Sequence, residues 1–241
     1  GWFVTVFALM QFLASPLLGA LSDRFGRRPV ILLSNLGLGL DFVLMALANT
    51  LPVLFLGRVI SGITAASVGT ANAYLADVTP PEGRTRAFGL LGAAFGIGFV
   101  VGPAVGGMLG EIDLRAPFWL AAGLSLCNFL YGWFVLPESL PPERRTPRID
   151  WRRANPVGAL ALLRSHPKVM GLATLLFLGA LAHYALVATF VLYADYRYGW
   201  GEATVGWVLA AIGGLNAAVR GVLAGIVARR FGERRAVLWG L

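Results

Sequence analysis

A few charged and polar side chains interrupt the long apolar stretches of this sequence, and they are the residues best suited to chemistry. In the N-terminal part these residues are Asp41 and Arg58. In the C-terminal part they are His183, Asn216 and Arg220. A charge at the centre of a bilayer costs roughly 2.5–3.5 kcal/mol on insertion scales. Asp41 would lie about 18 Å into its helix at ~1.5 Å per residue. We therefore expect Asp41 to face protein or water and to be functional.

The other four residues have simpler explanations that stay open. Arg58 would lie about 10 Å from the outer end of its helix, so its guanidinium could reach the membrane surface. His183 can carry a proton near neutral pH, but a lone histidine in a membrane can equally be a hydrogen-bonded packing residue. Asn216 and Arg220 lie one turn apart. Arg220 could reach the cytoplasmic surface or bind an anionic or polar substrate.

A second group of charges lies in the short stretch Gly19–Arg28, which joins two apolar runs. Asp23 can accept from backbone N–H groups at a helix start and can pair with an arginine. Gly26 permits a tight turn, and Gly19 permits close approach of two helices. Such a contact would hold two helices together at one membrane face and could open and close. The simpler alternative is a basic loop with a capping aspartate.

The same stretch recurs near the end of the chain, at Gly225–Arg234, where it again ends one apolar run and opens the next. The identical pairs are Gly19/Gly225, Arg24/Arg230, Phe25/Phe231, Gly26/Gly232 and Arg28/Arg234. Transporters are often built from duplicated halves. The repeat therefore predicts two homologous helical bundles.

A third pattern is a run of glycines in the predicted helix at 86–110. It comprises Gly89, Gly98, Gly102, Pro103, Gly106 and Gly107. Gly98, Gly102, Gly106 and Gly110 are spaced by four, so they share one helical face at which backbones can approach closely. Pro103 removes a backbone hydrogen bond and bends the helix. Such a face suits a helix that rocks against a neighbour, although ordinary packing of small residues is the alternative.

The elements that position these residues are membrane helices. Of 241 residues, 57% are hydrophobic and 13% are charged, about half the ~25% charged residues of a soluble domain. A soluble fold of this length would expose large apolar patches. Seven stretches reach the ~20 residues that a spanning helix needs. They lie near residues 2–21, 29–49, 52–76, 86–110, 117–136, 169–194 and 203–227, and an eighth begins at Ala236.

The distribution of arginine predicts the orientation of these spans. The loops expected after the first, third, fifth and seventh spans hold 16 of the 20 basic residues, and the opposite loops hold only Arg115 and Arg197. Loops rich in basic residues face the cytoplasm. The net charge of +8 is therefore an orientation signal, because a nucleic-acid-binding domain would carry a basic stripe on a soluble fold. The single cysteine, Cys127, gives no disulfide and no multi-cysteine metal site.

The proline-rich and charged segment 137–167 divides the chain. We expect an N-terminal bundle at 1–136, a cytoplasmic linker at 137–167 and the start of a C-terminal bundle at 168–241. Residues 155–164 could form a short interfacial helix, although a plain solvated linker is the simpler alternative. The chain opens on Gly1 inside an apolar run without a charged leader, so we expect no signal peptide and expect both ends to be cuts through a longer protein.

Several of these stretches resemble one family of transporters. Gly19, Asp23, Arg24, Gly26, Arg27 and Arg28 match the cytoplasmic loop signature of the major facilitator superfamily, and the glycine run resembles that of its drug/proton antiporter branch. Other stretches are similar to the tetracycline/proton antiporters, from that family's second span into its ninth. They are Asp41, 57–62, 76–77 with Arg84, 116–118, 137–139, 196–200 and 231–235.

The resemblance implies an all-α membrane protein, a major facilitator-type bundle of two pseudo-repeated halves joined by a cytoplasmic loop. Asp23 and Arg27 would belong to a cytoplasmic gate, with Asp77 and Arg84 as its charge partners. Asp77 lies at a helix end, where a purely structural ion pair is the alternative.

The resemblance also implies that Asp41 faces the central cavity and that Arg58 belongs to a proton relay. At the Asn216 and Arg220 positions the tetracycline pumps carry histidine and glutamine, so this chain departs from their pattern there.

The function implied is proton-coupled efflux of a small amphipathic compound, such as a tetracycline-like drug, across a bacterial-type inner membrane. Lipid, protons and the substrate would be the partners of a monomeric protein without cofactor or metal. A metabolite uniporter or symporter is the main alternative. A seven-helix receptor is remote, because the one lysine, Lys168, lies at a membrane edge rather than mid-helix. No nucleophile elbow, metal-spaced histidine pair or phosphate loop suggests an enzyme.

Overall fold

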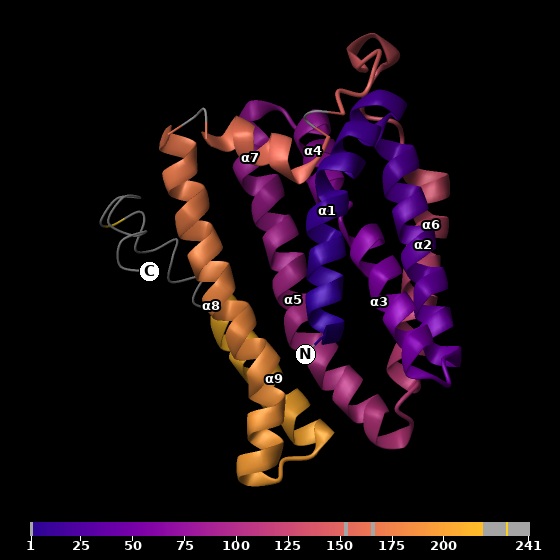
Figure 1. Cartoon of the computed structure of the whole chain (residues 1–241), viewed down its shortest axis with the longest axis vertical. Helices are drawn as coiled ribbons and strands as arrows, with labels where there is room; N and C mark the ends of the chain where they lie inside the picture. Colours follow the sequence, from indigo (N-terminus) through magenta and orange to yellow (C-terminus); the bar gives the residue numbers. More distant parts are fainter. Residues whose placement is uncertain (1, 152–153, 165–166, 219–229, 231–241) are drawn as a thin grey trace. The chain divides into compact units, whose positions relative to one another are not determined.

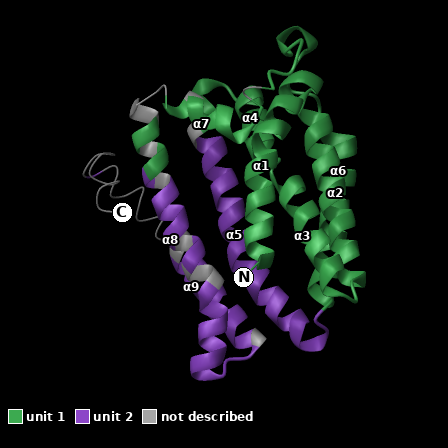
Figure 2. Cartoon of the chain, viewed as in Figure 1, with its two compact units in different colours: residues 1–84, 115–174 green, residues 85–114, 175–241 purple. Residues whose placement is uncertain are grey.

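The computed structural model describes residues 2–151, 154–164, 167–218 and 230. Every regular element among these residues is a helix. The chain forms two compact units (Figure 2): residues 1–84 with 115–174 make up unit 1, and residues 85–114 with 175–241 make up unit 2. The predicted division into two bundles and a linker stays a prediction.

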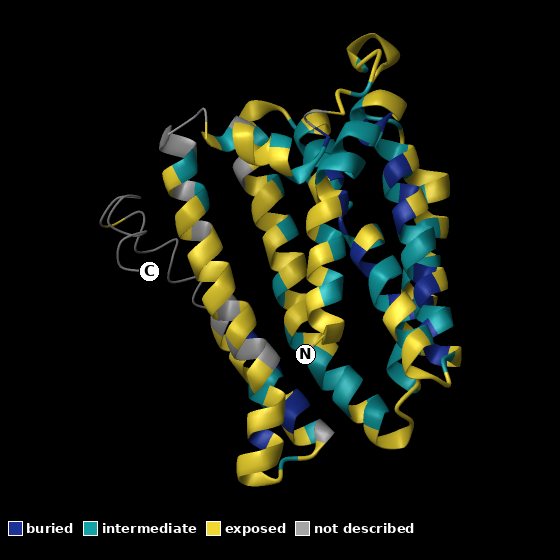
Figure 3. Ribbon diagram, in the orientation of Figure 1, coloured by how far each residue is buried: buried dark blue, intermediate teal, exposed yellow. Residues whose placement is uncertain are grey.

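Unit 1 is organised around α2 (Arg27–Leu47). The other helices of this unit are α1 (Trp2–Phe25), α3 (Leu51–Ala65), α4 (Val68–Val78), α6 (Ala116–Val135) and α7 (Pro156–Arg164). Helix α2 packs against α3 and α6, and α3 packs in turn against α1 (Figure 1). Most of the buried residues of unit 1 lie on α2 and α3, whereas the outer faces of the helices are apolar and exposed (Figure 3). Exposed apolar faces are what a lipid environment requires.

Five of the seven predicted spans are confirmed as helical segments long and apolar enough to cross a membrane. These segments are Trp2–Phe25, Arg27–Leu47, Leu51–Val78, Pro81–Ile112 and Ala116–Val135. The sixth predicted span lies within α8 (Pro167–Tyr198), and the seventh begins in α9 (Glu202–Ala218). The end of the seventh span, the eighth apolar run and all of the second loop copy except Arg230 lie outside the described residues.

The third span differs from the prediction because it is not one continuous helix. Helix α3 ends at Ala65 and α4 begins at Val68. At the break, Ala66 N donates to Ile63 O and Ser67 N to Thr64 O, both at 3.3 Å, in the tighter pattern of a 3₁₀ turn. The Thr64 hydroxyl bonds back to the carbonyls of Ile60 and Ser61. Such back-bonding bends helices, and apolar periodicity does not reveal it.

The linker contains the helix that the sequence predicted at 155–164. Helix α7 begins at Pro156, and the Asn155 side chain caps it by accepting from Gly158 N at 2.8 Å. Proline at the first helical position and asparagine before it are favourable choices there. Helix α7 lies against α1, and Leu140 and Ala154 of the linker are buried. The linker is therefore packed within unit 1 rather than fully solvated.

Unit 2 contains α5 (Arg84–Ile112) from Thr85 on, most of α8, and α9. Helix α9 approaches α5 closely through its own glycines. A Cβ added at Gly206 would lie 2.6 Å from Pro103 O and 3.4 Å from the Cα of Gly107, and one at Gly213 would lie 3.1 Å from Val100. Larger side chains at Gly206 and Gly213 would therefore force the two helices apart.

Four glycines of the α5 run have open space beside them among the described residues. A Cβ added at Gly89, Gly98, Gly102 or Gly106 would meet no atom within 4 Å. Of the predicted motif, Pro103 and Gly107 are the positions that α9 contacts. Close approach of a helix at the other glycines of α5 stays a prediction, because no described atom lies next to them.

Candidate functional site

The loop between α1 and α2 turns sharply at Gly26. This residue has φ +104° and ψ 159°, a left-handed conformation that favours glycine. A Cβ at Gly26 would also collide with the carboxylate of Glu138 and lie 3.1 Å from the Arg145 guanidinium. The residue type therefore matches both the backbone conformation and the crowding at this corner.

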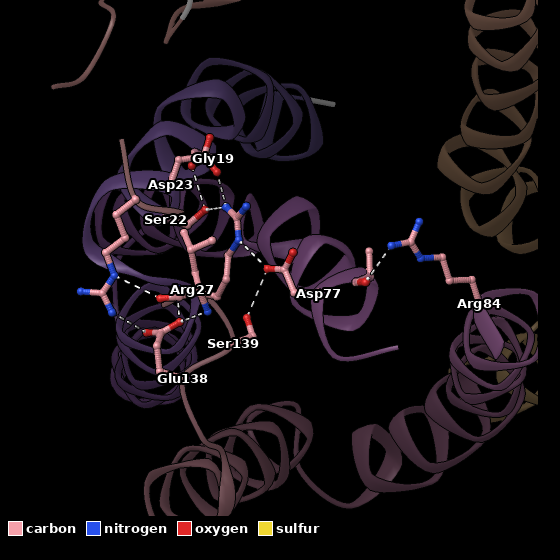
Figure 4. Close-up of polar contacts among 11 residues, drawn as sticks. Gly19, Ser22, Asp23, Arg27, Asp77, Arg84, Glu138 and Ser139 are labelled. Carbon is pink, nitrogen blue, oxygen red and sulfur yellow. Dashed lines mark hydrogen bonds and ion pairs between the residues drawn. The ribbon is translucent and has the colours of Figure 1, made fainter. Parts of the chain in front are cut away.

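Arg27 is the centre of the polar contacts at this corner (Figure 4). Its Nη1 lies 2.5 Å from Asp23 Oδ1 and 2.7 Å from Ser22 Oγ. Its Nε donates to Asp77 Oδ2 of α4 at 3.3 Å. Ser22 is fully buried, and the Arg27 side chain is 12% exposed. One guanidinium therefore ties the end of α1 and the start of α2 to the end of α4, bringing together two predicted gate partners, Arg27 and Asp77.

The linker supplies further contacts that the sequence did not single out as a site. Glu138 Oε1 accepts from the backbone N of Arg27 at 2.9 Å and from Leu140 N at 3.0 Å. The Ser139 hydroxyl donates to Asp77 Oδ2 at 3.3 Å. Arg145 Nη2 lies 3.8 Å from Glu138 Oε2. We call Ser22, Asp23, Arg27, Asp77, Glu138 and Ser139 the loop cluster.

Glu138 caps the N-terminus of α2, although it lies far from that helix in the sequence. Gly26, at the N-cap position, has no side chain to accept from the first backbone N–H groups of the helix. The Glu138 carboxylate accepts from one of these groups and places a negative charge at the positive end of the helix dipole. Thr146 N donates to Asp23 O at 3.0 Å and so satisfies a carbonyl in the last turn of α1. The linker therefore stabilises both helix ends at the corner.

Two other predicted loop residues, Arg84 and Arg28, donate to backbone carbonyls. Arg84 Nη2 donates to the carbonyl of Ala76 at 3.2 Å, so Arg84 meets the α4 backbone and not the Asp77 carboxylate (Figure 4). Arg28 donates to Trp133 O at 2.6 Å and lies over the Trp133 ring.

Gly19 and Arg24, at the end of α1, complete the predicted loop signature. Gly19 accepts from the Ser22 hydroxyl, and a Cβ added there would meet nothing within 4 Å. The described residues place no helix against Gly19, so the close helix approach expected there stays a prediction. Arg24 lies over the ring of its neighbour Phe25.

Asp41 forms a second polar centre, within the α2–α3 contact. The residue is 2% exposed, and its Oδ2 accepts a hydrogen bond from the Ser61 hydroxyl. Arg58 Nη2 donates to Met45 Sδ at 2.8 Å. Asp41 therefore faces protein, on the side of α2 that packs against α3, as expected for a charge within a span. That it faces a central cavity stays a prediction. Gly57 makes the approach possible, since a Cβ there would lie 3.2 Å from Asp41 Oδ1.

The remaining predicted residues lie in unit 2. His183 is in α8 and Asn216 is in α9, but their side chains are outside the described part of the chain, as is the whole of Arg220. An apolar groove of about 480 Å³ runs along α5 beside the glycine run. Its lining residues are Leu91, Ala94, Phe95, Gly98, Phe99 and Pro103. Among the residues described, no three His, Cys, Asp or Glu side chains are grouped to hold a metal ion.

The sequence profile of the Major Facilitator Superfamily matches residues 1–241. The class C tetracycline resistance protein of Escherichia coli is 43% identical over 241 residues, which cover 100% of this chain and 60% of that protein. Multidrug resistance protein 2 of Bacillus subtilis (strain 168) is 28% identical over 239 residues, which cover 98% of this chain and 60% of that protein.

A solved structure is also similar. The crystal structure of the human organic anion transporter MFSD10 (TETRAN) matches with a TM-score of 0.76 and 30% sequence identity, covering 91% of this chain and 55% of that one. The chain thus spans about 60% of the length of the curated relatives described above.

Proposed function

The chain belongs to the Major Facilitator Superfamily, and on that premise we propose that this protein exports a small amphipathic organic compound in exchange for protons. The observation that carries the proposal is the loop cluster, in which Arg27 joins Asp23 and Asp77 while Glu138 caps α2. Ion pairs at partly exposed sites are individually weak. A cluster of this kind can therefore close one face of a helical bundle and still open within a transport cycle.

The second element of the proposal is a proton-binding carboxylate inside the membrane. Asp41 is buried between two helices, with Arg58 close to it. Intramembrane carboxylates commonly take part in proton relays, because protonation removes a charge that is costly to bury. We propose that Asp41 gains and loses a proton in each cycle, with Arg58 as the neighbouring charge.

The substrate class is proposed from the relatives. The bacterial relatives are named for resistance to tetracycline or to several drugs, and the structural neighbour is named an organic anion transporter. We propose an amphipathic drug-like compound as the substrate, with tetracycline as the first one to test. We further propose that the arginine-rich loops and the linker face the cytoplasm of an inner membrane and that the protein works as a monomer.

Everted membrane vesicles containing the full-length protein test the proposal. After respiration acidifies the lumen, adding tetracycline or ethidium should release protons, as read by a pH-sensitive dye. The Asp41→Asn variant should insert normally and show no drug-dependent proton release. Uptake of a drug without proton movement would indicate a uniporter, and absence of both across a broad drug panel would argue against drug/proton exchange.

A further inference from the structure

The two oxygens of the Asp41 carboxylate are in different environments. Oδ2 accepts the hydrogen bond of the Ser61 hydroxyl, and Ser61 is itself 3% exposed. Oδ1 is buried, and no hydrogen-bond partner meets it among the described residues. A buried polar atom without a partner is costly, and more so when it carries charge. The unpartnered oxygen is therefore the atom at which a bound proton would relieve the largest penalty.

Arg58 lies close to Asp41 without pairing with it. Arg58 is one turn before Ser61 on α3, and its Nη2 donates to the sulfur of Met45, one turn after Asp41 on α2. No ion pair joins Asp41 and Arg58, both of which are described residues. The two helices therefore make two separate contacts, Ser61 with Asp41 and Arg58 with Met45.

The other helices packed on α2 bring no further charge to this point. Helices α1, α4 and α6 also contact α2. The charged residues of α1 and α4 lie at their loop ends (Asp23, Arg24 and Asp77), and α6 carries none. Arg58 of α3 is thus the charged group near Asp41 on the helices that pack against α2, and the hydroxyl of Ser61, also on α3, holds the carboxylate.

We propose that Ser61 is a positioning residue for proton binding by Asp41. Its hydroxyl holds Oδ2 in the role of the carbonyl oxygen and leaves Oδ1 to form the O–H bond with a proton taken from water. Protonation converts the carboxylate into a neutral carboxyl, and release of that proton to water restores the charge. This inference rests on the proposed function, in which Asp41 exchanges a proton during transport.

Infrared difference spectroscopy of the full-length protein in lipid vesicles tests the assignment of the two oxygens. Lowering the pH should produce a C=O stretching band of the protonated Asp41 carboxyl that is missing in Asp41→Asn. The band should move to higher frequency in Ser61→Ala, because the carbonyl oxygen loses its donor. Ser34→Ala, a buried serine two turns earlier on α2, should leave the band in place. A band that does not move in Ser61→Ala would overturn the proposal.

Transport kinetics separate positioning from drug binding. In everted vesicles, Ser61→Ala should lower the maximal rate of drug-dependent proton release roughly tenfold, the size expected when a hydrogen bond to a charged group is lost. The KM for the drug should change less than about twofold, because a residue that only positions Asp41 leaves drug binding unchanged. Ser61→Thr, which keeps the hydroxyl, should restore the rate at wild-type protein level.

The outcomes of the two experiments are distinguishable. An effect on KM alone, or an unchanged maximal rate in Ser61→Ala, would contradict the positioning role. Absence of drug-dependent proton release by the wild-type protein would instead contradict the proposed function. The infrared band would still decide, in that case, how Ser61 holds Asp41.

Discussion

At the scale of single residues, Arg27 holds the loop cluster together because its guanidinium donates to three oxygen atoms. Asp23 and Ser22 accept from its Nη1, and Asp77 accepts from its Nε. Arginine suits this position because its donors are fixed in a planar fork, whereas a lysine would offer a single ammonium group. The cluster thus depends on the residue type as well as on its charge.

Asp23→Asn should abolish drug-dependent proton release while leaving membrane insertion nearly intact. The substitution keeps the shape of the side chain but removes the charge that faces Arg27 at 2.5 Å. Asp23 is 48% exposed, so the fold should tolerate the change. Transport in everted vesicles, normalised to protein level by immunoblot, checks this prediction. Normal transport by the variant would remove the gating role of Asp23.

Glu138→Ala should slow transport several-fold and destabilise the corner by about 1–2 kcal/mol, the range for the loss of a helix cap. The carboxylate accepts from Arg27 N and Leu140 N, so its removal leaves both donors without this acceptor. Glu143→Ala is the matched control, since Glu143 is exposed in the same linker. Thermal unfolding in detergent and drug transport measure the difference. Equal behaviour of the two variants would show that Glu138 has no capping role.

At the scale of helices, unit 1 is held together by close approaches at particular glycines. Helix α3 meets α1 at Gly62, where an added Cβ would lie 2.5 Å from Phe7 O and 2.7 Å from Met10 Cβ. Apolar side chains cannot drive helices together in lipid as they do in water, so close backbone packing contributes a larger share of the stability.

Gly62→Ala should therefore destabilise the protein by about 1–3 kcal/mol, the usual cost of overpacking. Gly69→Ala is the control, because Gly69 also lies in a helix but a Cβ there meets no atom within 4 Å. Alanine is the better helix former, so the control should be neutral or stabilising by about 0.5–1 kcal/mol. Thermal unfolding of both variants in the same detergent compares them. The prediction is contradicted if Gly62→Ala is as stable as Gly69→Ala.

At the scale of the whole molecule, the sidedness of the loops follows from the distribution of arginine and can be measured. With Cys127 and any other native cysteine replaced by serine, a cysteine introduced at Ser139 should react with a membrane-impermeant maleimide only in everted vesicles. A cysteine at Glu111, near the C-terminal end of α5 and on the side expected to face outward, should react only in intact cells. The reverse pattern would invert the proposed orientation.

Much of the helical architecture could be predicted from the sequence, because long apolar runs must form helices in a membrane and satisfy their own backbone. The first five spans follow from that constraint, whereas the short helix of the linker follows from the proline and asparagine at its start. The break after Ala65 does not, because it depends on local hydrogen bonds of Thr64 and Ser67. The loop signature likewise marked Asp23 and Arg27 in advance, since paired charges beside a glycine turn are rare in an apolar sequence.

Which side chains pair with Glu138 and Asp41 was decided by tertiary packing alone. Glu138 is 111 residues from Arg27, and no spacing rule connects a linker carboxylate with the first N–H groups of a distant helix. Asp41 was recognisable as a costly charge, but the α2–α3 contact determined that Ser61 holds one oxygen and leaves the other free. Local chemistry and hydropathy specify which segments become helices. Which side chains meet depends on how those helices pack, because contacts between helices join residues that are far apart in the chain.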